Sequence, residues 1–223
     1  MHFLKWGNGK KQIVCLHGWP GEGSKWAELA SHLVRENSMI WALDLPGWGD
    51  SEIEFEMKLE DYANELKKFI EENEINKPIL IGHSFGGKLA IKFTNLYPDD
   101  VYKLVLISSS GIIEKNGLSN LVKNFIWRRN HPWINSQDYK KASEIKKNTF
   151  EKVVVEDVMK EASTITCPTL LIYGNYDKIT PFKIGETFRD VINNSKLEIV
   201  EGDHTIAFRN VHQIVPLISM FID

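Results

Sequence analysis

Cysteine is scarce in this chain: its 223 residues include only Cys15 and Cys167. Two cysteines cannot form the disulfide framework of a small secreted protein, and their separation does not match the close pairs of zinc sites. No apolar run approaches the roughly 20 residues that a membrane span requires. The first residues, 1–7, also lack the apolar stretch of a signal peptide. These absences predict a cytoplasmic protein without membrane insertion.

An excess of charge of either sign is also missing. The formal net charge is −3, which gives no general attraction to nucleic acid or to an anionic membrane. Hydrophobic residues make up 43% of the chain and charged residues 26%, which is ordinary for a globular protein. A chain of this length can bury one substantial core, so we expect one main domain.

Short β-rich runs alternate with longer helical patterns along most of the chain. The expected strands are nearly continuous apolar runs at residues 12–16, 39–44, 78–82, 103–108, 169–173 and 196–200. Such runs are typical of parallel strands buried on both faces. The alternation therefore predicts an α/β fold in which a mostly parallel, doubly wound sheet carries helices on both faces. A further short strand is expected at residues 2–6, before the first of these runs.

Helical patterns fill the intervals between these strands. Helices are expected at residues 24–37 and 85–97, and an apolar stripe between Leu59 and Ile70 predicts another. The C-terminal residues from Phe208 to Ile222 form a comparable stripe. Pro216 is expected to kink that helix or to mark the start of a new turn.

Residues 112–165 interrupt the alternation because they contain no convincing strand. They hold ten Lys and Arg against seven Asp and Glu, so this stretch is more basic than the rest of the chain. We interpret it as a helical insertion into a core formed by residues 1–111 and 166–223. Trp127, Arg128 and Arg129 lie within it and are candidates for contacts with a substrate.

The strongest single motif is Gly82-His83-Ser84-Phe85-Gly86, which follows an apolar strand and precedes a helix. A G-x-S-x-G sequence in this context predicts a tight turn that exposes the serine hydroxyl. Glycines flank such a turn because strand and helix approach closely there. Ser84 is therefore the predicted nucleophile. His83 is expected to pack beside it or to line the pocket, and not to be the base.

A second glycine-rich bend, His17-Gly18-Trp19-Pro20-Gly21, follows the strand at 12–16. A tetrahedral intermediate requires hydrogen-bond donors where its negative oxygen forms. The backbone N–H groups of Trp19 and Phe85 are the predicted donors, and Pro20 cannot serve because it has no N–H. His17 is expected to hold this loop by hydrogen bonds.

An acid and a base follow the last two predicted strands. Asp177 comes after the strand at 169–173, and His204 after the strand at 196–200. Both lie past the carboxyl ends of parallel strands, where active sites of open α/β sheets are found. His204 is the predicted base and Asp177 its orienting acid. Asp203 and Asp44 compete for the acid role, but Asp203 adjoins His204 too closely, and Asp44 is assigned to loop structure.

With these residues in place, the chain resembles the α/β-hydrolase superfamily over nearly its whole length. The matching segments are HGWPG, DLPGWGDS, GHSFGG, GNYDKITP and GDH, in this order. The resemblance implies the same roles for the catalytic set, a helical cap formed by residues 112–165, an acyl-serine intermediate, and no cofactor or metal. Compared with this family the cap is short and the N-terminus is abbreviated, with one strand at residues 2–6 before the run at 12–16, so the sheet is expected to have fewer than eight strands. Haloalkane dehalogenases and epoxide hydrolases share DLPGWG but have an aspartate nucleophile where this chain has Ser84.

These features favour hydrolysis of a small, partly apolar carboxylic ester or a related acyl bond. Two alternatives remain open. A carbon–carbon bond hydrolase or a menaquinone-pathway lyase resembles this fold and triad, and Arg128, Arg129 or Lys88 could then bind an anionic substrate. A non-catalytic ligand-binding protein is the alternative from another class. The acyl chain length, the natural substrate and the oligomeric state do not follow from the sequence.

Overall fold

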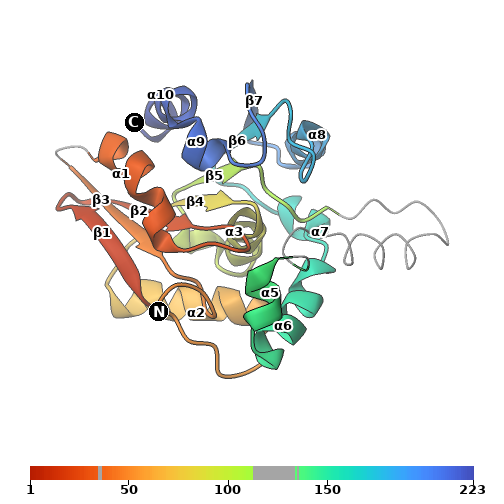
Figure 1. Cartoon of the computed structure of the whole chain (residues 1–223). Coiled ribbons are helices and arrows are strands. Elements are labelled where there is room, and N and C mark those ends of the chain that lie inside the picture. Colours follow the sequence, from red (N-terminus) through yellow and green to blue (C-terminus); the bar gives the residue numbers. More distant parts are fainter. Residues whose placement is uncertain (35–36, 113–133, 135) are drawn as a thin grey trace.

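A seven-stranded sheet in the order β1-β3-β2-β4-β5-β6-β7 forms the centre of the molecule. The computed structural model describes residues 1–34, 37–112, 134 and 136–223 (Figure 1). The strands are β1 (Phe3–Gly7), β2 (Lys11–Leu16), β3 (Ser38–Leu43), β4 (Ile79–His83), β5 (Lys103–Ile107), β6 (Thr169–Gly174) and β7 (Ser195–Val200). Only β1 runs antiparallel to its neighbour, β3, and all other pairings are parallel. The predicted α/β fold with a mostly parallel sheet is therefore confirmed.

Helices cover both faces of this sheet. The helical elements are η1 (Gly23–Trp26), α1 (Ala27–Leu33), α2 (Leu59–Glu72), α3 (Phe85–Leu96), η2 (Pro98–Asp100), α5 (Gln137–Lys141), α6 (Glu144–Val154), α7 (Met159–Ala162), α8 (Phe182–Val191), α9 (Ile206–Arg209) and α10 (Val211–Ile222). Helices α1, α9 and α10 lie together on one side of the sheet, and α2 lies on the other (Figure 1).

Successive side chains of each strand point to opposite faces of the sheet, which divides the core into two layers. On β2, Val14 and Leu16 face the layer that contains α2 and α3, whereas Ile13 and Cys15 face the layer of α1 and α10. Because both sets are fully buried, the strands are apolar at successive positions and not only at every second one. The continuous apolar runs of the sequence follow from this double burial.

The six predicted core strands agree with the structure to within one residue at each end, and the short N-terminal strand is present as β1. The first helix differs from its predicted range of 24–37. It begins as the 3₁₀ turn η1 and ends at Leu33, because Val34 has an extended backbone with ψ of 116°. In the C-terminal stretch, the helix restarts after Asn210, and α10 continues through Pro216. Helix α8 was not predicted.

Three helices, α5, α6 and α7, occupy the described part of the stretch between β5 and β6. Helix α6 is fixed to the core through hydrogen bonds from Met57 N to Thr149 Oγ1 (3.1 Å) and from Lys88 Nζ to the carbonyl of Val153 (2.6 Å). Glu156 accepts a hydrogen bond from Leu59 N, at the first turn of α2. The division into a core and a cap at residues 112–165 stays a prediction, since 113–133 and 135 lie outside the described residues.

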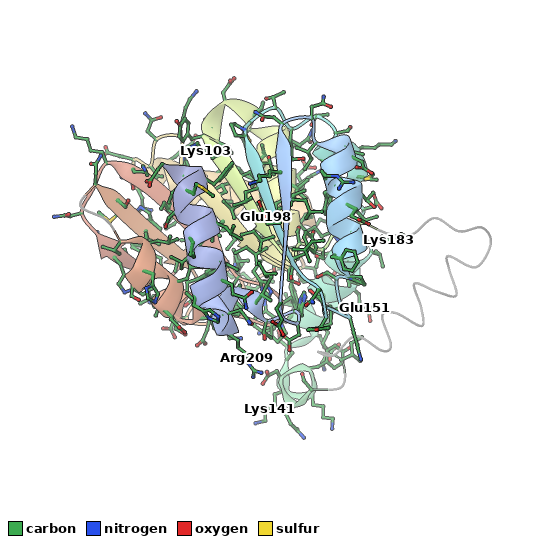
Figure 2. All side chains as sticks on the ribbon, turned by 90° about the horizontal axis from the view of Figure 1, so that it is seen from above. Lys103, Lys141, Glu151, Lys183, Glu198 and Arg209 are labelled. Atoms are coloured by element: carbon green, nitrogen blue, oxygen red, sulfur yellow. The ribbon has the colours of Figure 1, made fainter. Side chains whose placement is uncertain are left out.

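The carboxyl ends of the parallel strands define the edge of the sheet where a site is expected. Lys103, at the start of β5, and Arg209, beyond β7, lie at opposite ends of the molecule, and Lys141 of α5 lies at the same end as Arg209 (Figure 2). The described insertion helices therefore approach the carboxyl edge. Among the described residues, no helix is both long and apolar enough to cross a membrane.

Candidate active site

Ser84 occupies the single position between β4 and α3. Its backbone has φ of 52° and ψ of −114°, a conformation that residues other than glycine adopt rarely. The Ser84 N–H donates to the carbonyl of Ile107 on the neighbouring strand β5, at 3.1 Å. Strand pairing therefore fixes the turn, and the strained backbone holds the serine side chain at the carboxyl edge of the sheet.

Two glycines permit this turn because other backbone atoms fill the space of a side chain. A Cβ on Gly82 would lie 2.5 Å from the carbonyl oxygen of Gly86, and a Cβ on Gly86 would collide with the carbonyl oxygen of Leu16. The contact with Leu16 also shows that α3 starts directly against β2. The glycines of the G-x-S-x-G sequence are thus explained by close backbone approach.

Hydrogen bonds join Ser84, His204 and Asp177 in series. His204 Nε2 lies 3.0 Å from Ser84 Oγ, and His204 Nδ1 lies 2.8 Å from Asp177 Oδ2. The three residues come from the ends of β4, β6 and β7, which the sheet brings to one edge. Sequence reasoning identified these three residues, and the structure brings them together.

The carboxyl group of Asp177 is buried and saturated with hydrogen bonds. Its Oδ1 accepts from the backbone N–H groups of Ile179 and Thr180, both at 2.8 Å. Burial alone would raise the pKa of this carboxyl, but the hydrogen bonds and charge of His204 and the bonds from Thr180 outweigh burial and lower it. Asp177 is therefore held as a carboxylate with one oxygen directed at His204.

Thr180 is a site residue that sequence reasoning missed. Its hydroxyl lies 2.8 Å from Asp177 Oδ2, 3.1 Å from His204 Nδ1 and 3.0 Å from the carbonyl of Ser108. The side chain is buried, so water does not replace these contacts. A threonine three residues after the acid was the only signal in the sequence, and many unrelated loops contain the same spacing.

The bend after β2 lies directly against Ser84. A Cβ on Gly18 would lie 3.0 Å from Ser84 Cβ, so the chain passes the serine at the residue before Trp19. The Trp19 and Phe85 rings pack edge to face, with centroids 5.3 Å apart. Phe85 is the first residue of α3, where a backbone N–H has no partner within the helix. Both predicted oxyanion donors thus belong to segments that border Ser84.

Two buried histidines support the loops of the site. His17 Nδ1 donates to the carbonyl of Gly18 at 2.8 Å, and His17 Nε2 accepts from Leu45 N at 3.0 Å. The predicted loop-holding role of His17 is confirmed. Burial lowers its pKa to about 4, and the backbone bond to Gly18 and the charge of Asp44 only partly offset this, so the ring is neutral near pH 7.

His83 packs behind the base. Its Nε2 donates to the backbone carbonyl of His204 at 2.8 Å, and its ring centroid lies 4.9 Å from that of His204 and 5.0 Å from that of Phe208. Burial, followed by the charge of His204, lowers the pKa of His83 to about 3. The side chain is only 5% exposed, which fits the predicted packing role. A neutral His83 positions the backbone of His204.

The competing carboxylates are engaged elsewhere. Asp44 accepts hydrogen bonds from Gly23 N and Asp50 N and pairs with His2, so its predicted loop role is confirmed. Asp203 Oδ1 accepts from the backbone and hydroxyl of Thr205. Of the three acids considered, Asp177 alone has a hydrogen bond to the His204 ring within the described residues.

The structure describes only one of the side chains predicted to bind an anion. Lys88 is buried, and its ammonium donates to the carbonyl of Val153 at the end of α6, so it ties the insertion to the core. Burial lowers the pKa of Lys88 to about 8, although nearby carboxylates oppose the shift. Trp127, Arg128 and Arg129 lie outside the described residues.

Similarity to known proteins identifies the family of this chain. The family model for the alpha/beta hydrolase fold matches residues 11–157. The chain belongs to this family. The α/β hydrolase is 26% identical to "Putative esterase/lipase 1" of Mycoplasma genitalium, over 94% of this chain and 90% of the relative. It is also 26% identical to the Escherichia coli 2-hydroxy-6-oxononadienedioate/2-hydroxy-6-oxononatrienedioate hydrolase, over 95% of this chain and 88% of that protein.

Solved structures confirm the fold. An esterase from Exiguobacterium antarcticum superimposes with a TM-score of 0.81 at 20% sequence identity and covers 99% of this chain and 94% of its own. At this identity the likeness concerns the fold alone. The family thus includes both esterase-like relatives and hydrolases with other substrates, and the choice between them depends on the chemistry of the site.

Proposed function

We propose that this α/β hydrolase is a serine hydrolase that cleaves small carboxylic esters through an acyl-serine intermediate. The observation that carries the proposal is the hydrogen-bonded series from Ser84 Oγ through the His204 ring to Asp177. A serine hydroxyl is a weak nucleophile until an adjacent base removes its proton. In this series His204 is in reach of that proton, and Asp177 is in reach of the opposite ring nitrogen.

The hydrogen bonds support one protonation state for the resting site. Because Asp177 is ionised it can only accept, so His204 Nδ1 carries a proton and donates a hydrogen bond to Asp177. His204 Nε2 then has a lone pair that accepts a hydrogen bond from the Ser84 hydroxyl. This is the tautomer that a general base requires. Asp177 also stabilises the imidazolium that forms when His204 has taken the serine proton.

The reaction proceeds in two halves that use the same groups. Ser84 Oγ attacks the ester carbonyl while His204 Nε2 takes its proton, and the carbonyl oxygen becomes negative. The backbone N–H groups of Trp19 and Phe85 donate to this oxygen, a contribution worth about 3 kcal/mol for each donor. His204 then protonates the leaving alkoxide, and the alcohol departs. Water, deprotonated by His204, attacks the acyl-serine, and His204 returns this proton to Ser84 Oγ as the bond to the acyl group breaks and the carboxylic acid is released.

A panel of p-nitrophenyl esters from acetate to dodecanoate tests this proposal. We expect turnover with an optimum at short or medium chain lengths, because the predicted substrates are small. In parallel, a fluorophosphonate should label the protein, and mass spectrometry of the peptides should place the label on Ser84. A protein that neither hydrolyses any of the esters nor reacts with the fluorophosphonate is not a serine hydrolase.

Carbon–carbon bond hydrolysis is a second candidate, supported by the relative from Escherichia coli at 26% identity. Cleavage of a carbon–carbon bond also needs an activated oxygen nucleophile and a proton donor, which the same set could supply. Lys88, one of the anion partners first considered for this reaction, is engaged with Val153 instead. Fluorophosphonate labelling without ester turnover would favour this second candidate.

Thr180 is proposed as a positioning residue for Asp177 and His204. Thr180→Val keeps the shape of the side chain but removes the hydroxyl that contacts both groups. Hydrogen bonds to charged groups contribute about 1.5–3 kcal/mol, so we expect kcat to fall about 10- to 100-fold while KM changes little. Thr180→Ser keeps the hydroxyl and should recover most of kcat. Steady-state kinetics on one ester, with thermal unfolding as a check on stability, measure both variants.

An equal loss in the serine and valine variants would contradict this role for the hydroxyl and would instead point to packing of the methyl group. A change confined to KM would mean that Thr180 contacts the substrate.

A further inference from the structure

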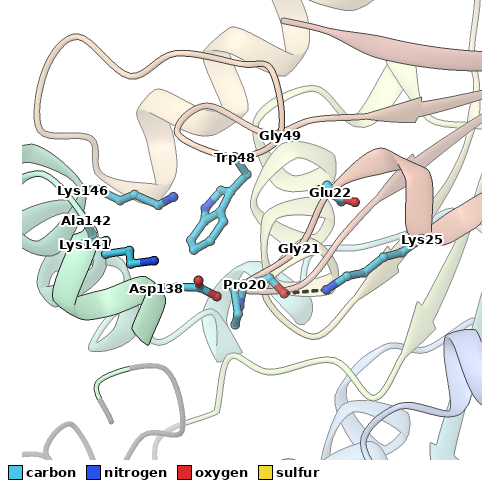
Figure 3. A pocket seen from close by; sticks show the side chains of 10 residues that line it. All are labelled: Pro20, Gly21, Glu22, Lys25, Trp48, Gly49, Asp138, Lys141, Ala142 and Lys146. Carbon is cyan, nitrogen blue, oxygen red and sulfur yellow. Dashed lines mark hydrogen bonds between the residues drawn. The ribbon is translucent and has the colours of Figure 1, made fainter. Parts of the chain in front are cut away.

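A cavity lies beside the bend that carries Trp19. It has a volume of about 380 Å³, within the range of small-ligand sites. Pro20 and Gly21, directly after Trp19, form one wall, Trp48 and Gly49 after β3 form another, and residues of α5 and the start of α6 close it (Figure 3). Ser84, His204 and Asp177 are not part of its lining. The cavity is thus a separate space on the oxyanion side of the site.

Trp19 connects this cavity to the reacting groups. Its ring packs edge to face against Trp48, with centroids 5.1 Å apart, and against Phe85, with centroids 5.3 Å apart. The same residue supplies a proposed oxyanion donor through its backbone. The cavity lining thus begins at Pro20, the residue directly after the proposed oxyanion donor.

Three lysines direct positive charge at this space. Lys25, Lys141 and Lys146 line the cavity, and none of them is in an ion pair within the described part of the chain. The Lys25 ammonium donates to the carbonyl of Pro20 at 3.5 Å (Figure 3). By contrast, Lys147 and Lys152, on the same helix as Lys146, are paired with Glu144 and Glu56. Among the described residues, Lys147 and Lys152 are thus paired with carboxylates, whereas Lys146 has no carboxylate within salt-bridge distance and interacts with the charge of Asp138 across the cavity.

Lys146 is the best placed of the three. Its ammonium lies 3.4 Å from the centroid of the Trp48 ring, a cation–π contact that holds the charge at the cavity wall. Figure 3 shows the Lys146 and Lys141 side chains extending from the insertion toward Trp48. Burial lowers the pKa of Lys146, and the charge of Asp138 opposes this. An anion in the cavity would compensate a partly buried ammonium.

The charges of the cavity indicate which anion fits. Glu22 and Asp138 also line it, so three ammonium groups face two carboxylates. One carboxylate would neutralise the remaining single positive charge, whereas a phosphate dianion would leave an excess of negative charge in the cavity. A cavity of this size accommodates a short acyl chain that ends in such a group.

We propose that this cavity binds the terminal carboxylate of an acyl substrate, with Lys146 as its principal partner, so that the enzyme prefers half-esters of short dicarboxylic acids. This inference rests on the proposed function, because it assigns the far end of the acyl group that Ser84 attacks.

Two p-nitrophenyl esters of equal shape test the preference. The glutarate half-ester carries a carboxylate, and in the 5-methylhexanoate ester two methyl groups replace its two oxygens. We expect Lys146→Met to raise KM about tenfold for the glutarate half-ester, which corresponds to one charged hydrogen bond. KM for the neutral ester should change less than about twofold. Lys140→Met, which removes an exposed lysine of α5 outside the cavity lining, is the matched control.

A direct binding measurement separates this inference from the proposed function. Saturation-transfer NMR with monomethyl glutarate should give a saturable signal with the Ser84→Ala protein, and Lys146→Met should abolish that signal while Lys140→Met retains it. If no ester is hydrolysed but this binding pattern is found, the proposed function fails and the carboxylate site stands. Ester hydrolysis without any charge preference, binding that Lys146→Met leaves intact, or equal competition by inorganic phosphate would each overturn the carboxylate site.

Discussion

Ser84→Ala is expected to lower kcat for p-nitrophenyl esters by about 10⁵- to 10⁶-fold, the effect of removing the nucleophile from a serine hydrolase. The hydroxyl that is lost lies 3.0 Å from His204 Nε2 and is the only group of Ser84 that the proposed mechanism uses. KM should change little, because the substrate pocket keeps its shape. The remaining rate should come from oxyanion stabilisation and binding alone.

The control for this prediction is Ser219→Ala on α10, a second buried serine on a helix away from the site. It should leave the rate unchanged. His204→Ala should cost about as much as Ser84→Ala, and the double variant little more, because residues that act as one unit have non-additive effects. Ester turnover that survives in the Ser84→Ala protein would reveal a contaminating hydrolase or another nucleophile.

Much of the site could be predicted because its residues follow buried parallel strands. A strand that is covered on both faces is a continuous apolar run, so the ends of β4, β6 and β7 are visible in the sequence. Ser84 directly follows such an end, and Asp177 and His204 come three and four residues after theirs. The topology of a parallel sheet then places them at the same edge.

The role of Thr180 could not be predicted from strand ends alone. Its hydroxyl contacts Asp177, His204 and the carbonyl of Ser108, and these groups come from the ends of three different strands. Only the folded loop after β6 brings them together. The role of Lys88 has the same origin, since its hydrogen-bond partner Val153 is distant in the sequence. The packing of His83 was predicted, but its hydrogen bond to the backbone of His204 was not.

Helix α8 was missed for a related reason. Only Gly185 and Phe188 of this helix are buried, so its apolar stripe is narrow. Gly185 also weakens the helical pattern, because glycine is a poor helix former. A Cβ at this position would lie 2.5 Å from the ring of Tyr173 on β6. The glycine therefore permits close packing of α8 on the sheet, a requirement that the sequence alone does not reveal.

Asp177→Asn is expected to reduce kcat by about 10⁴-fold with little change in KM. The two backbone N–H groups of Ile179 and Thr180 must face an oxygen, so the amide NH₂ of the new asparagine would be directed at His204 Nδ1. That nitrogen would then accept a hydrogen bond, and the ring proton would move to Nε2. His204 in this tautomer cannot take the proton of Ser84.

Asp203→Asn is the matched control, because Asp203 adjoins the base in sequence but bonds to Thr205. The activity of Asp203→Asn should remain close to that of the unchanged protein. If Asp203→Asn were inactive and Asp177→Asn retained more than a tenth of kcat, the orienting acid would have to be reassigned.

The stability of Asp177→Asn in acid should also differ from that of the unchanged protein. The pKa of Asp177 is lower in the folded protein than in the unfolded chain. Ionised Asp177 therefore stabilises the fold above about pH 4, the pKa of an aspartate in the unfolded chain. This stabilisation is lost as the pH falls through the lower pKa of the folded protein. Asp177→Asn carries no titrating group at this position. Its free energy of unfolding should therefore decline less between about pH 5 and pH 3 than that of the unchanged protein. Urea unfolding at several pH values measures this difference, and parallel curves would mean that the hydrogen bonds to Asp177 do not favour its ionised form.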